Sequence, residues 1–438
     1  FASGHRWGWF PSVSGGWVIS NEKFMQKTAS WMDFLKIRGS WGQVGNNNIG
    51  SFLYASSVSL ASTGYNFGTG KGTTANSNGA YANRLGNDDL KWETSEQTDL
   101  GFDARFLRSR LGLNFDWYYK KTKDWLVQAP IIGTAGADAP YINGGDVTNK
   151  GVEVNLSWND NIGSFSYNVG GNFAYNKNEV GSIPTSDGMI HGSTSASALR
   201  DNMGEYYRCS DGHAMGYFWG YKTAGLFQNE QEINDWVAAG NGLLANTAPG
   251  DIKVIDVNHD GIINDKDKVD LGNGIPKWNF GFNLGCNWKN FDFSIVFQGA
   301  ADFKIANGQY RNWGNNNGKA NYTTYFLQRW TGEGTTNSVP RLTTDDHNWT
   351  NFSDLWLEDG DYLRISNVTL GYDFSKLLKC KYISQARLYA QVQNLYTFTN
   401  YSGMDPEVGF GGEAWVSGID AGCYPHARTI LFGVNLKF

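Results

Sequence analysis

The sequence predicts an all-β fold: an antiparallel transmembrane β-barrel wall with long extracellular loops. Three observations predict it: an unusual composition, segments of about ten residues that alternate apolar and polar side chains, and short connections that alternate with long ones. The chain has 438 residues, including 55 glycines and only 9 prolines, with 15% aromatic and 18% charged side chains. Abundant glycine and aromatic residues with few charges favour many pleated strands over helices.

Net charge and hydropathy argue against two other classes of protein, nucleic-acid-binding proteins and proteins that cross a membrane with helices. With 36 Lys and Arg against 42 Asp and Glu, the formal net charge is −6, so the basic footprint of a nucleic-acid-binding protein is missing and no nucleic-acid partner is predicted. No stretch approaches the roughly 18 consecutive apolar residues that a transmembrane helix needs.

The alternation identifies individual strands. From Leu111 to Lys120 the apolar side chains fall on every second position, with asparagine, aspartate, glycine or lysine on most of the others. About eleven segments follow this rule. They are 7–19, 35–44, 98–106, 111–120, 152–158, 165–175, 278–288, 291–297, 363–374, 386–395 and 428–438. In 363–374 the apolar phase slips between Ile365 and Val368, which predicts a β-bulge within one strand.

Loop lengths separate two readings of these strands. A soluble β-sandwich also alternates, so a secreted carbohydrate-binding or adhesive module with a structural calcium site stays open as the alternative. Short connections at 107–110, 160–164 and 289–290 nevertheless alternate with long ones at 45–92, 178–276, 301–362 and 397–426. Short turns at one end and long loops at the other are typical of outer-membrane barrels.

A barrel also predicts which way side chains point. The apolar members of each strand should face lipid and their neighbours should face a lumen. The outward set comprises Phe115, Val154, Phe282 and Val434, and the inward set Asn114, Glu153, Asn283 and Asn435. An odd number of strands cannot close a barrel with an even strand number, so we expect further strands upstream of Phe1.

Several phrases resemble one known family, the SusC/RagA-type TonB-linked outer-membrane transporters, nearly from end to end. They are 8–14 (GWFPSVS), 35–38 (LKIR), 90–93 (LKWE), 149–153 (NKGVE), 250–253 (GDIK), 357–360 (LEDG), 362–364 (YLR), 367–372 (NVTLGY), 393–395 (QNL) and 401–407 (YSGMDPE). The resemblance implies a barrel of about 22 strands around a plug, of which residues 1–438 would be the carboxy-terminal part. The plug, the TonB box and the other strands would then precede Phe1.

The function that the resemblance implies is nutrient import across the outer membrane of a Gram-negative cell. TonB would drive it, and a SusD-like surface lipoprotein would cap the barrel. The sequence shows neither HExxH nor GxSxG, so we predict no catalytic site and no enzyme. The abundance of tryptophan and asparagine favours an oligosaccharide over a peptide as substrate.

The sharpest local motif lies in an insertion at 250–276 and fits a calcium loop. The predicted ligands are Asp256, Asn258, Asp260, the carbonyl of Ile262, Asn264 and Asp267, with Gly261 at the sharp turn. Asp267 stands where an EF-hand has glutamate, and no helix pair flanks the loop, so a dockerin-like or thrombospondin-like loop is closer. The sequence thus predicts a structural Ca²⁺ as the cofactor, and an acidic surface turn without an ion is the alternative.

Aromatic residues on the long loops could stack on sugar rings, although packing within the loops would also explain them. They are Trp219, Tyr221, Trp236, Trp313, Trp330, Trp349 and Trp415.

Overall fold

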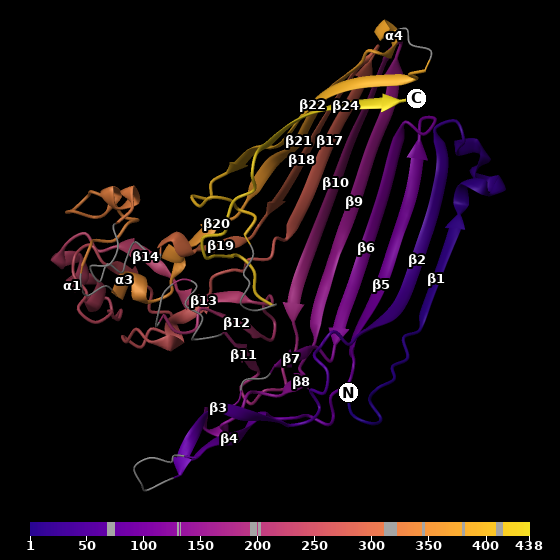
Figure 1. The fold of residues 1–438 in the computed structure, drawn as a ribbon. Helices are drawn as coiled ribbons and strands as arrows, with labels where there is room; N and C mark the ends of the chain where they lie inside the picture. Colours follow the sequence, from indigo (N-terminus) through magenta and orange to yellow (C-terminus); the bar gives the residue numbers. More distant parts are fainter. Residues whose placement is uncertain are drawn as a thin grey trace.

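One antiparallel sheet of eleven strands dominates the computed structural model of this chain (Figure 1). The structure describes residues 1–67, 75–128, 131, 133–192, 199, 203–310, 322–343, 347–378, 382–408 and 415–438. The strands, in their order in the sheet, are β1 Ser12–Val18, β2 Met32–Asn46, β5 Glu93–Phe106, β6 Leu111–Lys123, β9 Val147–Ile162, β10 Phe165–Val180, β17 Trp278–Trp288, β18 Phe291–Ala301, β21 Tyr362–Asp373, β22 Gln385–Thr399 and β24 Thr429–Lys437. All eleven predicted strands are confirmed.

The connections alternate as predicted. Turns of a few residues join β5 to β6, β9 to β10 and β17 to β18, and the helix α4 (Ser375–Leu378) lies between β21 and β22. The long connections leave from the other end of the sheet, at the bottom and left of Figure 1. Two short 3₁₀ turns, η1 Ile19–Asn21 and η2 Lys23–Thr28, link β1 to β2.

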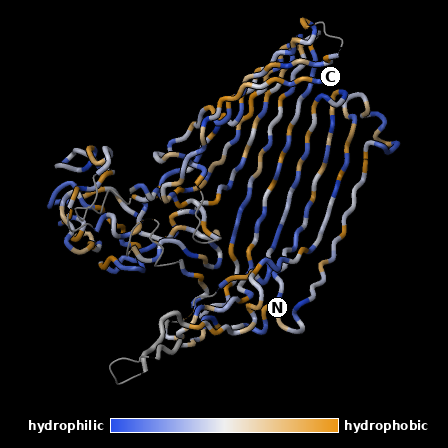
Figure 2. The backbone as a smooth tube through the Cα atoms, in the orientation of Figure 1, coloured by the Kyte–Doolittle hydropathy of each residue, from blue (hydrophilic) through white to orange (hydrophobic). Residues whose placement is uncertain are grey.

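Pairing register sorts the side chains into two faces. One row of directly paired residues crosses nine strands and is wholly apolar, and another is almost wholly polar. The apolar row is Phe106, Leu111, Trp158, Val169, Leu284, Ile295, Val368, Val392 and Ile430. The polar row is Asp103, Asn114, Asn155, Asn172, Gly281, Gln298, Arg364 and Thr397. Figure 2 shows the alternation along each strand.

The apolar face remains uncovered, which decides between barrel wall and sandwich. Phe282 is 39% exposed, Val434 57% and Phe432 80%, whereas in a sandwich such residues would lie in a dry core between two sheets. The pairing register places Phe115 and Val154 opposite one another on this same face. The predicted outward set is therefore confirmed, and the secreted-module alternative does not fit.

The predicted bulge in β21 is confirmed at Ser366, where the register against β18 shifts between Val296 and Phe297. Strand limits differ from the prediction by several residues. β9 and β10 continue to Val147 and Val180 at the long-loop end, because backbone pairing persists where both faces are polar and alternation no longer marks it. In contrast, β1 begins only at Ser12, and Trp7 is 92% exposed.

The long connections were predicted as loops, but they contain small sheets. A four-stranded sheet combines β11, β12, β13 and β16, a three-stranded sheet combines β20, β19 and β23, and three strand pairs complete the set. Their bounds are β3 Ser57–Phe67, β4 Ala75–Arg84, β7 Leu126–Gln128, β8 Tyr141–Asn143, β11 Met189–His191, β12 Tyr207–Ser210, β13 Tyr217–Tyr221, β14 Thr223–Leu226, β15 Ile252–Val254, β16 Lys268–Asp270, β19 Lys304–Asn307, β20 Leu357–Asp359 and β23 Ile419–Asp420.

Three connections, 181–277, 302–361 and 400–428, fold together into one loop body with its own hydrophobic core. Phe218, Trp356 and Ile419 come from different connections and meet in this core, each fully buried. The helices are α1 Glu230–Ala238 and α3 His347–Thr350, with 3₁₀ turns η3 Gly133–Ala135, η4 Asp265–Asp267, η5 Gly308–Tyr310, η6 Thr324–Gln328 and η7 Asp354–Trp356. Among the described residues, no helix has both the length and the apolar character to cross a membrane.

The two faces predict opposite responses to the same substitution in β9. We expect Val154→Arg to destabilise the full-length protein by about 2–4 kcal/mol, because it places a charge against the lipid midplane. Its neighbour Asn155→Arg, on the polar face, should change stability far less. Urea titration of the lipid-reconstituted protein measures both, and equal losses would contradict the assignment of the faces.

Candidate functional site

Charged side chains on the polar face pair across the wall. Arg38 on β2 donates to Asp116 at 2.7 Å and lies 3.4 Å from Asp103, and Arg387 on β22 donates to Asp292 on β18 at 2.7 Å. These pairs are about one-fifth to one-third exposed. Exposed pairs contribute little stability, but they cancel the charge of the wall locally.

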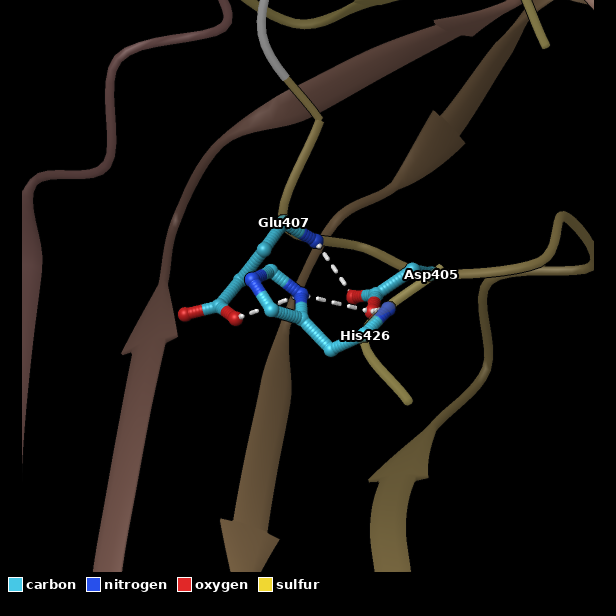
Figure 3. A group of neighbouring side chains, drawn as sticks. All are labelled: Asp405, Glu407 and His426. Carbon is cyan, nitrogen blue, oxygen red and sulfur yellow. Dashed lines mark hydrogen bonds and ion pairs between the residues drawn. The ribbon is translucent and has the colours of Figure 1, made fainter. Parts of the chain in front are cut away.

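Arg364 on β21 differs from these, because it is only 2% exposed. Its Nη2 donates to Asp405 Oδ1 at 2.5 Å, its Nη1 pairs with Glu407, and its Nε donates to Thr397 Oγ1 of β22 at 2.9 Å. Asp405 and Glu407 belong to the 400–428 connection, where His426 lies beside them (Figure 3). Two carboxylates of a loop therefore bind a side chain of the wall. We name Arg364, Asp405, Glu407 and His426 the Arg364 lock.

Neighbouring groups satisfy the remaining atoms of the lock. Glu407 Oε1 accepts from the hydroxyl of Tyr362 at 2.7 Å and from Gln298 Nε2 at 3.0 Å. Asp405 Oδ2 accepts from the backbone N–H of His426 at 2.9 Å and lies 3.0 Å from its Nδ1. The connection is thereby fastened to two adjacent strands, β18 and β21, and Arg364 is in turn bound to Thr397 of β22.

The lock holds Asp405 in its charged form. Burial alone would raise the pKa of Asp405, but hydrogen bonds from the backbone of His426 and Glu407 and the charge of Arg364 lower it below its ordinary value. A carboxyl group whose pKa is lowered on folding adds stability above its unfolded pKa, about 3.9, and loses it as pH falls through the folded value. The lock should therefore be intact at neutral pH.

Among the described residues, Asp405, Glu407 and His426 form a group whose potential metal-ligand atoms all lie within 4.8 Å of one another. A bound cation would sit beside the guanidinium of Arg364, which already pairs with both carboxylates. Like charges at such separations repel strongly in a buried site. The chemistry favours an ion-pair lock over a metal centre.

The predicted calcium residues lie together in the turn between β15 and β16. Gly261 has φ +78°, as the sharp turn requires. Asp256 and Asp267 are fully buried. Asp256 Oδ2 accepts from the N–H of Gly261 at 2.8 Å, and Asp267 Oδ2 accepts from that of Asn264 at 2.8 Å.

The other predicted ligands are engaged locally. The side-chain oxygens of Asn258, Asp260 and Asn264 each accept from the backbone N–H two residues further on, at 2.9 Å, forming Asx turns. The Ile262 carbonyl accepts from Asn264 Nδ2 at 3.2 Å. Asp256, Asp260 and Asp267 all belong to the described residues. Their carboxylate oxygens do not all lie within 4.8 Å of one another, as the possible ligand atoms of Asp405, Glu407 and His426 do.

One atom in this loop is nevertheless unpaired. Asp256 Oδ1 is buried and accepts no hydrogen bond, which is costly for a carboxylate oxygen unless another group meets it. Burial would raise the pKa of Asp256, but backbone N–H groups, foremost that of Gly261, leave it below its ordinary value. Asp256 is therefore a charged group with one free buried oxygen.

Most of the loop aromatic residues pack within the loop body. Tyr221 and Trp349 are buried, and Trp236 lies edge-on against Phe227 with ring centroids 5.9 Å apart. Trp313 lies outside the described residues. Trp415 is half-buried and lines a pocket. Trp330 packs against the buried cluster that contains Tyr221, so packing accounts for Tyr221, Trp349, Trp236 and Trp330.

A buried polar centre at Asp251 escaped sequence reasoning. Asp251 is fully buried and accepts from Arg341 Nε at 2.8 Å, from Asn348 Nδ2 at 2.9 Å and from the N–H of Ala248 at 2.9 Å, and His347 Nε2 lies 3.1 Å away. Burial opposes its ionisation, but these partners hold the pKa of Asp251 well below its usual range. Two connections distant in sequence are thus joined, and no local pattern signals it.

The lock predicts an asymmetry between two arginines of the polar face. Arg364→Met should destabilise the 400–428 connection by about 3–5 kcal/mol, because it leaves buried carboxylates unpaired. Arg38→Met, which breaks a partly exposed pair on the polar face, should cost under about 1 kcal/mol. Rates of limited proteolysis within 400–428 of the full-length protein measure the difference. Equal rates in both variants would refute the lock.

Comparison with known proteins identifies the family. Residues 1–395 match the family model described as TonB dependent receptor-like, beta-barrel. TonB-dependent receptor P3 of Formosa agariphila is 31% identical over 447 residues, covering 100% of this chain and 42% of that protein. SusC of Bacteroides thetaiotaomicron is 28% identical over 445 residues, covering 100% and 41%. The chain thus spans about two fifths of the length of these relatives.

Solved structures agree on the fold. The RagAB peptide transporter superposes with a TM-score of 0.78 at 23% identity, covering 100% of this chain and 44% of the matched chain. Its closed-closed state gives a TM-score of 0.79. The predicted resemblance is confirmed: the chain belongs to the TonB-dependent receptor β-barrel family and is an outer-membrane protein.

Proposed function

We propose that the chain is the carboxy-terminal part of the wall of an importer that passes an oligomeric nutrient through its lumen, driven by TonB. The observation that carries the proposal is the wall itself: one face apolar and exposed, the other polar and tied by the Arg364 lock to a folded loop body. A transporter needs a wetted interior and ordered outer loops. The substrate undergoes no covalent change in this proposal.

A SusD-like surface lipoprotein is the proposed partner. SusC and RagAB stand among the relatives in sequence and structure, and the loop body offers a folded surface at the long-loop end of the wall. The partner would close over this end, and a plug and TonB box outside the present sequence would couple to TonB.

An oligosaccharide is the proposed substrate class. RagAB is described as a peptide transporter, so a peptide is the competing substrate class. The tryptophan-rich loops support the saccharide. Since most of those rings pack internally, the support comes from the few that remain accessible, Trp415 among them.

Growth of the source bacterium tests import and substrate together. We expect deletion of the full-length gene, or of TonB, to abolish growth on one of maltohexaose, xylohexaose, laminarihexaose or levan while leaving growth on glucose intact. A tagged protein restored to the deletion strain should copurify a surface lipoprotein.

Two outcomes would contradict parts of this proposal. If growth on casein peptides is lost while every saccharide is still used, the substrate class is wrong and import stands. If the deletion leaves growth on all of these sources unchanged, import of this class of nutrient is wrong.

We further propose that the 256–267 loop binds one structural Ca²⁺. The fit rests on the unpaired, buried Asp256 Oδ1 and on the turn at Gly261, which places all the predicted ligands in one short loop. The carboxylates of Asp260 and Asp267 would move closer to Asp256 when the ion binds. Hydrogen bonds to a carbonyl or carboxylate oxygen leave a second lone pair for a cation, so the Asx turns are compatible with ligation. Asp256, Asp260 and Asp267 would supply charge, and the ion would clamp the connection between β15 and β16.

Calcium titration of the full-length protein in detergent tests the clamp. We expect one calorimetric site that Asp256→Asn weakens at least about tenfold, since a carboxylate is removed from the ion. Asp265→Asn is the matched control, because Asp265 lies in the same loop with its side chain 86% exposed. Saturating Ca²⁺ at about 100 times Kd should stabilise the loop by about 2.7 kcal/mol. Identical titrations for the Asp256 variant and the wild type would rule out this site.

A further inference from the structure

Three separate connections of the chain enclose a pocket of about 420 Å³ at the long-loop end of the wall. The connection that contains β7 and β8 supplies Trp125, Gln128 and Tyr141, β11 supplies His191, and the last connection supplies Trp415. This volume falls in the range of small-ligand sites.

The floor of the pocket is apolar and rigid. Val127 and Ile190 line the pocket and are buried, and they belong to a cluster with Val180, Ile183 and Cys209. Trp125 and Trp415 pack against this cluster. Trp415 also lies edge-on to Tyr207, with ring centroids 5.3 Å apart, so its ring is held in place.

The walls are three aromatic rings that remain half-buried: Trp125, Tyr141 and Trp415. Part of each ring is therefore exposed to solvent, whereas Trp356 in the core of the loop body is fully buried. Aromatic side chains present an apolar face and, in tyrosine and tryptophan, a polar tip. A sugar ring has the matching character, with C–H groups on its faces and hydroxyls around its edge.

His191 is the titratable side chain besides Tyr141 among the described residues that line the pocket, and it is already paired with groups behind the lining. His191 Nε2 lies 2.7 Å from Asp187 Oδ2 and its Nδ1 lies 3.0 Å from Glu205, and Arg208 Nη2 donates to Glu205 at 2.6 Å. Burial alone lowers the pKa of His191, but hydrogen bonds to the two carboxylates raise it overall. With His191 protonated, two positive groups balance two negative ones, so nothing here selects a charged ligand.

We propose that this pocket binds one uncharged sugar ring of the oligosaccharide substrate, between the rings of Trp125, Tyr141 and Trp415. The inference rests on the substrate class proposed above and adds the place where the saccharide is held. The exposed amide of Gln128, whose Nε2 donates to the carbonyl of Ala139 at 2.9 Å, lies at the rim beside hydroxyls of the ring. A peptide paired along the short β7 or β11 strands is the competing occupant.

Tyr141 is the residue to vary, because it borders the pocket without belonging to the packed cluster beneath it. In the full-length protein in detergent, Tyr141→Ala should weaken binding of the growth-supporting saccharide about 3- to 10-fold, the loss expected for one aromatic contact. Tyr141→Phe keeps the ring and should retain most of the affinity. Tyr81→Ala is the control, since Tyr81 is 54% exposed on the β3–β4 hairpin.

Hydroxyl-radical footprinting locates the saccharide independently of the variants. Each of maltohexaose, xylohexaose, laminarihexaose, levan and a casein digest is added in turn. We expect a saccharide to protect Trp125 and Trp415 and to leave Trp31, which is 48% exposed at the short-turn end, unchanged.

The outcomes separate this inference from the proposed function. A saccharide that binds without protecting either tryptophan, and with equal affinity for the Tyr141→Ala variant, overturns the pocket but leaves the substrate class standing. Protection by the casein digest alone overturns the saccharide as occupant. Absence of binding by every saccharide overturns the pocket together with the substrate class.

Discussion

Inside a bilayer every backbone N–H and C=O must find its partner within the protein, and the rest of this molecule depends on how the wall meets that constraint. Its strands pair side by side from β1 to β24. Continuous pairing enforces a period of two, which gives lipid one face and water the other. Functional groups are then confined to the polar face and the strand ends. Arg364 stands where these meet, on the polar face at the long-loop end of β21.

The same constraint explains why the wall could be predicted from sequence. Because one face of each strand meets lipid and the other the lumen, apolar and polar residues alternate over about ten residues. A pattern of this length can be recognised in the sequence without knowing which strands pair. Even the bulge at Ser366 left its mark as a phase slip. Apolar and polar residues alternate only where one face of a strand meets lipid. The extensions of β9 to Val147 and of β10 to Val180 lie beyond this region, so alternation did not mark them in the sequence.

The loop body could not be predicted in the same way, because its strands of two to five residues are too short for a period. Its organisation comes from contacts between residues far apart: Arg364 lies 41 positions from Asp405, and Asp251 lies 90 from Arg341. Helix α1 did carry a local signal that was overlooked, since Asn229 accepts from the N–H of Glu232, three residues on, as a capping residue does. The 256–267 pattern was local and was recognised, but its side-chain geometry could not be read from spacing.

Hydrophobic burial and buried ion pairs contribute differently to this loop body. The apolar core supplies most of the stability, but burial is non-directional, so it does not by itself fix how three connections lie on the wall. Arg364 with Asp405, and Asp251 with Arg341, pay a desolvation cost and are favourable only in one geometry. These buried ion pairs therefore fix the position of the connections relative to the wall and to one another. In the pocket, Trp125 and Tyr141 come from one connection and Trp415 from another, so the shape of the pocket depends on how the two connections are held together. Trp415 belongs to the same connection as Asp405, so we expect the lock on the wall to help to position the third side of the pocket.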